Sequence, residues 1–189
     1  MDKHEDDKAI FGFWVYLMTD CVLFASLFAT YAVLRTSTFG GPMARQLFDL
    51  PSVLTETIIL LTSSFTCGLA MLAMQNRKKA NLFAWLLITL LLGISFLTLE
   101  VNEFSHLIHT GNGPDRSAFL SAFFTLVATH GLHIFAGSVT IITLMVQLWR
   151  KGLTAPTVRR LTALSLFWHF LDVIWIFIFS IVYLVGVVL

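Results

Sequence analysis

The segment SLFWHFLDVIWIFIFSIVYLVG, residues 165–186, consists almost entirely of apolar side chains. It exceeds the roughly 20 residues that an α-helix needs to cross the hydrocarbon core of a bilayer. His169 and Asp172 nevertheless stand in its middle, at a spacing that puts both on one face of a helix. The segment therefore predicts a membrane-spanning helix whose polar face meets another helix or a cavity rather than lipid.

The composition of the whole chain fits the same environment. Of its 189 residues, 57% are hydrophobic and 12% are charged, and the mean hydropathy is +0.84. A soluble domain carries about 25% charged residues. We expect an all-α integral membrane protein, in which an N-terminal tail (residues 1–9) precedes one five-helix transmembrane domain (residues 10–189). The predicted spans cover residues 10–34, 52–75, 82–109, 117–149 and 161–188.

The Lys and Arg residues indicate the orientation, because they concentrate on the cytoplasmic side of membrane proteins. Arg35, Arg45 and Arg116 fall on one side of the predicted spans. The other nine share the opposite side, and they are Lys3, Lys8, Arg77, Lys78, Lys79, Arg150, Lys151, Arg159 and Arg160. We therefore predict a cytoplasmic N-terminus and a C-terminus on the outer side of the membrane.

Nine ionisable side chains inside the predicted spans are candidates for a functional site, and no Lys or Arg lies well inside any span. Because successive helices alternate in direction, the nine fall into two layers. Those predicted near the midplane are Asp20, His130, His133, His169 and Asp172. Those predicted toward the outer face are Glu56, Glu100, Glu103 and His106. Each layer draws on more than one helix, which makes pairing between helices possible.

Four interpretations of these residues stay open at the level of the sequence. Interhelical hydrogen bonds would fix the packing of the bundle, each contributing about 0.6–2 kcal/mol. A proton-linked or lipid-headgroup role is the second. A metal site is the third, although only Glu103 and His106 have the Glu-x-x-His spacing found in di-iron bundles. Haem ligation by His130, His133 or His169 is the fourth.

Four segments are similar to one known family. They are residues 10–34 (IFGFWVYLMTDCVLFASLFATYAVL), 100–108 (EVNEFSHLI), 113–137 (GPDRSAFLSAFFTLVATHGLHIFAG) and 165–186. Together they resemble subunit III of the haem-copper respiratory oxidases, and the resemblance runs from Ile10 to Gly186. The five-span form resembles that of quinol oxidases and some bacterial cytochrome c oxidases. The segment GPDRSAFLSAFF is most similar to ubiquinol oxidases of the cytochrome o type, with the menaquinol oxidases close behind.

The resemblance implies a fold and a function. The first two spans would be set apart from the other three by a V-shaped cleft that holds phospholipid. The chain would be a non-redox accessory subunit in a bacterial inner membrane, with its C-terminus in the periplasm. Its complex would oxidise quinol, reduce oxygen to water and pump protons. Subunit I would carry the haems and copper and would be the direct partner, with subunits II and IV completing the complex. This chain would support the stability and proton uptake of subunit I, binding no cofactor itself and no nucleic acid.

The resemblance also suggests roles for the buried polar residues. Asp20 stands where cytochrome c oxidases have a buried, carbodiimide-reactive Glu, whose side chain is one methylene longer. The residues Glu103, His130, His133, His169 and Asp172 match recurrent family positions, and we expect them to bond between helices and to line the cleft. The rival hypotheses are subunit III of a menaquinol or cytochrome c oxidase, a small proton-linked transporter, and a free-standing membrane cytochrome b.

Overall fold

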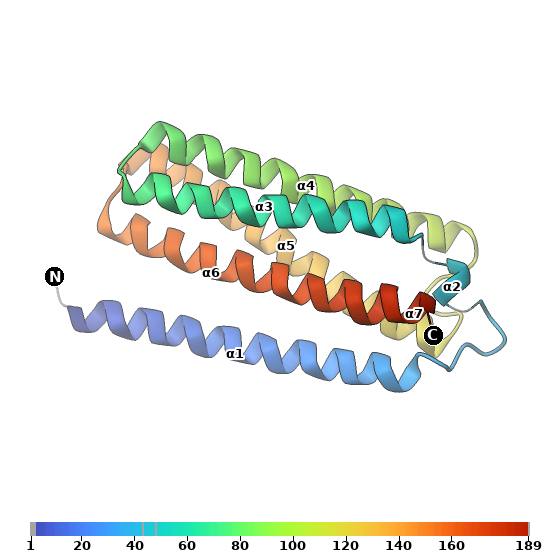
Figure 1. Cartoon of the computed structure of the whole chain (residues 1–189). Helices are drawn as coiled ribbons and strands as arrows, with labels where there is room; N and C mark the ends of the chain where they lie inside the picture. The colour runs from blue at the N-terminus through green and yellow to red at the C-terminus, as the bar shows by residue number, and fades with distance from the viewer. Residues whose placement is uncertain (1–2, 43, 48, 189) are drawn as a thin grey trace.

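The computed structural model describes residues 3–42, 44–47 and 49–188, which fold into a bundle of long helices (Figure 1). The long helices are α1 (Lys3–Leu34), α3 (Leu50–Gln75), α4 (Lys79–His109), α5 (Ala118–Lys151) and α6 (Ala155–Ile178). The short elements are α2 (Ala44–Leu47), the π-helix η1 (Phe179–Leu184) and α7 (Val185–Val188). Five segments are long and apolar enough to cross a membrane, and they are Phe11–Leu34, Leu50–Gln75, Lys79–His109, Ala118–Lys151 and Ala155–Val187. The prediction of an all-α membrane protein with five spans is confirmed.

Helix α6 begins earlier than its hydropathy predicts. It starts at Ala155 rather than near Leu161, and a proline occupies its first turn. Proline suits that position, because its missing N–H would have no partner inside the helix. Because this first turn is polar, the hydropathy pattern does not include it in the predicted span. Helix α5 begins where expected, and the backbone N–H of Leu120 donates to Oγ of its N-cap, Ser117, at 3.2 Å.

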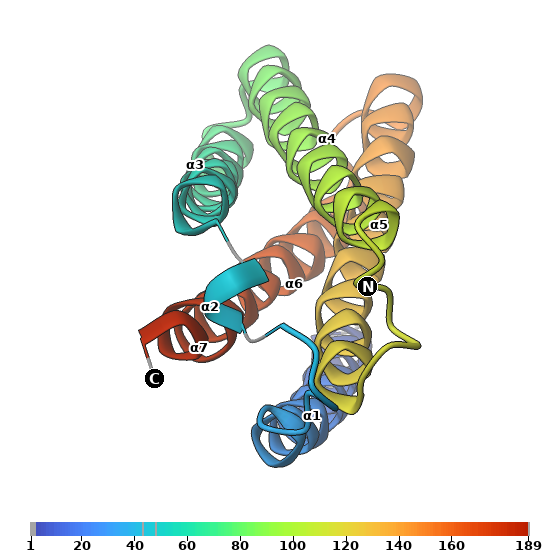
Figure 2. The ribbon, with the colours of Figure 1, turned by 90° about the vertical axis from the view of Figure 1, so that its right-hand side faces the viewer.

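Helix α6 occupies the middle of the bundle. It packs against α3, α5 and α1. Helices α3 and α4 form an antiparallel pair, and α4 also packs against α5. Viewed along the bundle, α1 lies at one edge and the α3–α4 pair at the other (Figure 2). The N-terminus of α1, the α3–α4 turn and the α5–α6 turn share one end of the molecule (Figure 1).

The first two spans do not form a pair, which corrects one expectation. The second span, α3, packs on α4 and α6, whereas the first span, α1, packs on α5 and α6. The described parts of the connection between them (residues 35–42, 44–47 and 49) pass across the end of the bundle that holds α7, and α2 packs on α7 there. The connection is long enough for consecutive spans to lie on opposite sides of α6. The V-shaped cleft stays a prediction.

The indole of Trp168 on α6 is the centre of the packing between α4, α5 and α6. It is 1% exposed. A Cβ built on Gly93 would lie 2.9 Å from its Cη2 atom, and a Cβ on Gly137 would lie 2.9 Å from its Cζ3 atom. Any side chain at either glycine would therefore collide with the ring. The two glycines give α4 and α5 the close approach that small residues provide in membrane bundles.

The last span changes from α-helix to π-helix at Phe179. A π-helical turn widens the helix and rotates the residues after it relative to those before, and such turns often lie at functional positions. Here it accompanies the burial of Tyr183, whose side chain is directed toward α4. Nothing in the run FSIVYL distinguishes a π-turn from an ordinary apolar helix.

Candidate functional site

The predicted midplane residues form two separate contacts, one on each side of α6. The first joins α1 to α5. Asp20 Oδ1 lies 3.7 Å from His133 Nε2. The other ring nitrogen of His133, Nδ1, lies 2.7 Å from the carbonyl oxygen of Thr129. A carbonyl only accepts, so Nδ1 carries a proton. His133 thus connects the backbone of α5 to the Asp20 carboxyl group on α1.

The second midplane contact joins α6 to α3. His169 Nδ1 lies 2.7 Å from Ser64 Oγ. Asp172 is 8% exposed and lines the same open groove as His169 and Ser64. The face that His169 and Asp172 share is thus directed toward α3. The sequence alone does not identify Ser64 as the partner of His169, because a serine in an apolar helix is equally typical of close helix packing.

Two further contacts join α6 to α3 through indole N–H groups. Trp168 Nε1 donates to Ser63 Oγ at 3.1 Å, and Trp175 Nε1 donates to Thr57 Oγ1 at 3.1 Å. The Ser63 hydroxyl in turn donates to the carbonyl oxygen of Thr89 on α4 at 3.1 Å. These partners were also missed, since hydroxyl residues carry no sequence signal that distinguishes a bond within a helix from one between helices.

The outer layer gathers carboxyl groups from α3 and α4 around the π-helix. Tyr183 Oη donates to Glu103 Oε2 at 3.1 Å. Glu56 and Glu100 are each 3% exposed. The carboxyl group of Glu100 lies directly on α5, because a Cβ built on Gly131 would be 2.6 Å from both of its oxygens.

His130 is enclosed by aromatic rings rather than by carboxylates. Its side chain is fully buried. The ring centroids of Trp175, Phe96 and Phe24 lie 5.2, 5.9 and 6.4 Å from that of His130. Neither ring nitrogen has a hydrogen-bond partner among the described residues. His130 therefore belongs to the packed interior between α4, α5 and α6.

Buried polar atoms without a hydrogen bond occur in both layers. Within the described part of the chain, the buried side-chain atoms without a hydrogen bond are Asp20 Oδ2, Glu56 Oε2, both oxygens of Glu100, both ring nitrogens of His130, and Asp172 Oδ1. None of these groups forms an ion pair with Lys or Arg there. The interior thus contains individual polar groups, but among the described residues no buried Lys or Arg side chain balances a carboxylate there.

The Glu-x-x-His spacing does not produce a joint site. Glu103 is half-buried and bonded to Tyr183, whereas His106 is exposed at the outer end of α4. Among the residues that the structure describes, no three His, Cys, Asp or Glu side chains converge in a way that would hold a metal ion. The nine candidates therefore divide into interhelical contacts, an aromatic enclosure and one exposed residue.

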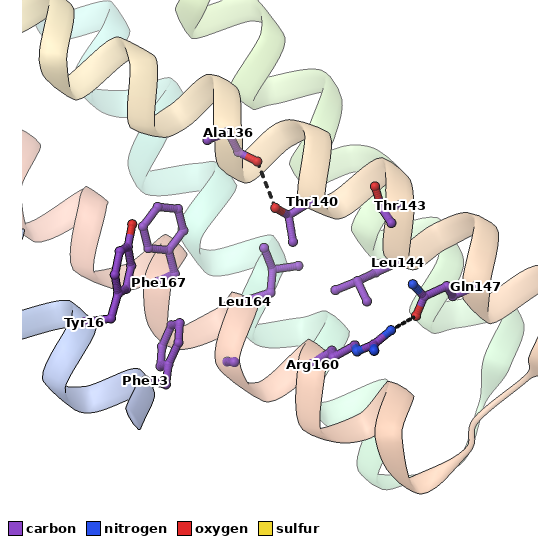
Figure 3. Close-up of a pocket in the computed structure, with 11 residues that line it drawn as sticks. Phe13, Tyr16, Ala136, Thr140, Thr143, Leu144, Gln147, Arg160, Leu164 and Phe167 are labelled. Atoms are coloured by element: carbon purple, nitrogen blue, oxygen red, sulfur yellow. Dashed lines mark hydrogen bonds between the residues drawn. The ribbon is translucent and has the colours of Figure 1, made fainter. Parts of the chain in front are cut away.

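A groove separates α1 from α5 and α6 near the end of the bundle that carries the N-terminus (Figure 3). It encloses about 440 Å³ and is lined mainly by apolar side chains, among them Phe13, Leu144, Leu164 and Phe167. A second hollow of about 440 Å³ adjoins it and also contains Phe13 and Arg160. Arg160 also lines the first groove, where its Nη1 donates to Gln147 Oε1 at 2.9 Å. The groove therefore combines an apolar wall with one exposed cation.

The architecture defines a class of protein, a polytopic helical membrane subunit with hydrogen bonds between its spans. Comparison with known proteins then gives the family. The family model described as "Cytochrome c oxidase subunit III" matches residues 6–187. This chain belongs to that family.

Individual relatives match nearly the whole chain. "Cytochrome bo(3) ubiquinol oxidase subunit 3" of Pseudomonas aeruginosa is 59% identical, covering 97% of this chain and 91% of the relative. The protein of the same name from Pseudomonas putida is 54% identical, covering 94% and 86%. "Quinol oxidase subunit 3" of Bacillus spizizenii is 47% identical, covering 94% and 87%.

Proposed function

We propose that this chain is the third subunit of a quinol-oxidising haem-copper oxidase, and that ubiquinol is the electron donor of its complex. The observation that carries the proposal is the near-full-length identity with two proteins named as ubiquinol oxidase subunits. It is supported by the lower identity with a relative named only as a quinol oxidase subunit. A menaquinol or cytochrome c oxidase is the alternative within the same family.

In this proposal the chain itself is non-redox and supports subunit I, which holds the haems and the copper. Subunits II and IV complete the complex in the bacterial inner membrane, and the complex reduces oxygen to water and pumps protons. The candidate polar residues inside the bundle act as interhelical links or proton-linked groups rather than as cofactor ligands. The hydrogen bonds of His169, Trp168 and Trp175 to α3 support a structural role for this interior.

The distribution of basic residues supports an orientation with the N-terminus in the cytoplasm and the C-terminus in the periplasm. The α3–α4 turn carries Arg77 and Lys78, and the α5–α6 turn follows Arg150 and Lys151. Both turns lie at the end of the bundle that carries the N-terminus (Figure 1). Positive loops of this kind stay in the cytoplasm.

The groove between α1, α5 and α6 takes the place of the expected lipid cleft in this proposal. A phospholipid would lay its acyl chains along Phe13, Leu164 and Phe167, and its phosphate would meet Arg160 (Figure 3). Long basic side chains at the end of a span reach the headgroup level in this manner. Filling the groove with Ala163→Phe should shorten the active lifetime of the complex, whereas Ala84→Phe on the exposed face of α4 should leave it unchanged.

The experiment that tests the assignment is purification of a tagged chain from its native membrane, followed by a reduced-minus-oxidised spectrum. The account predicts co-purifying larger subunits, a haem signal and oxygen uptake driven by ubiquinol. Uptake driven only by menaquinol or by reduced cytochrome c would shift the assignment to the alternative. A colourless single chain, obtained where other respiratory complexes stay intact, would overturn the oxidase assignment.

A further inference from the structure

Basic side chains from two helices meet at one end of the seam between α4 and α5. A hollow of about 470 Å³ is lined by Lys79 from the start of α4 and by Arg150 and Lys151 from the end of α5. All three are exposed. Lys79 reaches across the seam, since a Cβ built on Gly152 would lie 2.8 Å from its Nζ atom. The hollow thus concentrates three positive charges on a small area.

Among the residues whose side chains the structure describes, no acidic side chain lines the hollow. The sequence contains neither Asp nor Glu at residues 57–99 and 116–171, the stretches that include both sides of the hollow. Within the described residues, Lys79, Arg150 and Lys151 form no ion pair. The acidic residues at this end of the bundle belong to the start of α1, which lies at the opposite edge from α4 (Figure 1). The charge of the hollow is complementary to an anion from outside the chain.

The wall of the hollow is apolar and aromatic on its membrane side. Phe83, one turn below Lys79, is 38% exposed, and Trp149 is 82% exposed. The same helix faces continue inward with Leu87 on α4, 40% exposed, and Val146 on α5, 48% exposed. Cations therefore lie above an apolar seam, and aromatic side chains stand at the level between them, as they do at the interface of a bilayer.

We infer that this hollow binds an anionic phospholipid from the leaflet on the Lys- and Arg-rich side of the membrane. Lys79, Arg150 and Lys151 hold the phosphodiester, and the acyl chains follow the seam below Phe83 and Trp149. Basic pockets between transmembrane helices are suited to such headgroups. The site lies on the far side of α5 from the α1 groove and does not depend on the proposed function.

Two simpler accounts of the same residues lead to different expectations. Basic residues at this position also set the topology of a membrane protein, a role that needs no bound ligand. Lys79 also lies near the C-terminus of α5, where a cation interacts favourably with the helix dipole. Both accounts predict only the general attraction of exposed basic residues for anionic lipids, so charges beside the hollow should matter as much as those that line it.

Native mass spectrometry of the purified, delipidated complex distinguishes these accounts. Phosphatidylglycerol and phosphatidylethanolamine are added separately to the wild type, to K79Q/K151Q and to R77Q/K78Q. The last variant is the matched control, because it removes two charges from the adjacent turn whose side chains do not line the hollow. We expect the wild type to retain phosphatidylglycerol preferentially. Each neutralised lysine of the hollow should weaken that retention about fivefold, the factor that corresponds to about 1 kcal/mol per basic residue.

Equal losses in both double variants would overturn the inference, because they would indicate a general basic surface. Equal retention of the two lipids by the wild type would also overturn it. Glycerol phosphate and inorganic phosphate serve as headgroup probes without acyl chains, and displacement of the lipid by either at comparable concentration would reassign the hollow to a soluble anion. Trp149→Ala keeps the three charges but removes an aromatic side chain beside the proposed path of the acyl chains. It should still lower the retention of phosphatidylglycerol, which tests the acyl-chain contacts separately from the headgroup contacts.

Discussion

Helices α3 and α1 both pack on α6, but they are held to the bundle by different means. Three side-chain hydrogen bonds join α6 to α3, from Trp168, His169 and Trp175. In the described part of the chain, α1 contacts the other spans through the 3.7 Å pair between Asp20 and His133 and through a 3.3 Å hydrogen bond from Tyr31 Oη to the carbonyl oxygen of Val182 on η1. In the most apolar stretch of each helix, 44% of the residues of α3 are buried, compared with 22% of the residues of α1.

The difference indicates that two parts of the chain have different structural roles. The elements α3 to α6 form an interior in which shape and hydrogen bonds specify one packing. Helix α1 leaves part of its surface and an adjoining groove open to lipid or to another subunit. We therefore expect substitutions in the interior to prevent assembly, and substitutions at α1 to alter its attachment without preventing assembly.

The largest effect should come from Gly137→Val. The new side chain would collide with the buried ring of Trp168, and overpacking of this kind destabilises by about 1–3 kcal/mol. We expect little assembled complex, measured as the yield and melting temperature of the purified oxidase. Gly68→Val is the control, because a Cβ on Gly68 meets no atom within 4 Å. A normal melting temperature for Gly137→Val would show that the close fit of Trp168 against Gly137 does not specify the packing.

A smaller loss should follow Thr57→Val, which keeps the shape of the side chain but removes the acceptor of the Trp175 indole. Interhelical hydrogen bonds in membranes average about 0.6 kcal/mol and reach about 1.7 kcal/mol. The melting temperature should therefore fall by a few degrees. Thr62→Val removes an exposed hydroxyl that also donates to its own helix, and it should change nothing. Equal effects of the two substitutions would assign the loss to the helix itself rather than to the bond between helices.

Asp20→Ala should loosen α1 while leaving the interior intact. Its effect is measured by the rate at which a short bifunctional maleimide links Tyr16→Cys to Phe167→Cys, two positions whose native rings are in contact across the α1–α6 boundary, with centroids 6.2 Å apart. We expect slower crosslinking with an unchanged initial oxidase rate. Crosslinking at the native rate would mean that the Asp20–His133 pair does not fix α1, and immediate loss of all activity in an intact complex would indicate a catalytic role.

The smallest effect should come from His106→Ala, since His106 is exposed and takes no part in the bond between Glu103 and Tyr183. Glu103→Ala should lower the melting temperature, because it leaves the buried Tyr183 hydroxyl without this acceptor. The two variants separate residues that the sequence places on one helix face. A joint metal or proton site would instead give them similar phenotypes.

The depth of the two polar layers stays a prediction. The sequence predicted the number of spans, because apolar length determines it. It did not predict which helix each polar group contacts. That depends on how each helix is rotated about its axis, so Ser64, Thr57 and Tyr183 were not recognised as partners. The early start of α6 and the π-helix also have no hydropathy signal. The pairing of the first two spans was wrong, since it came from a resemblance to a larger family architecture rather than from the residues of the long α1–α3 connection.

The central claim is that this chain stabilises an oxidase without carrying its electrons. The most direct test compares the complex purified with and without this chain, measuring the haem spectrum, the initial rate of ubiquinol-driven oxygen uptake and the decline of that rate during turnover. The account predicts equal spectra and equal initial rates per haem, with a faster decline when the chain is missing. Loss of a haem signal, or of the initial rate, from otherwise intact partner subunits would contradict it.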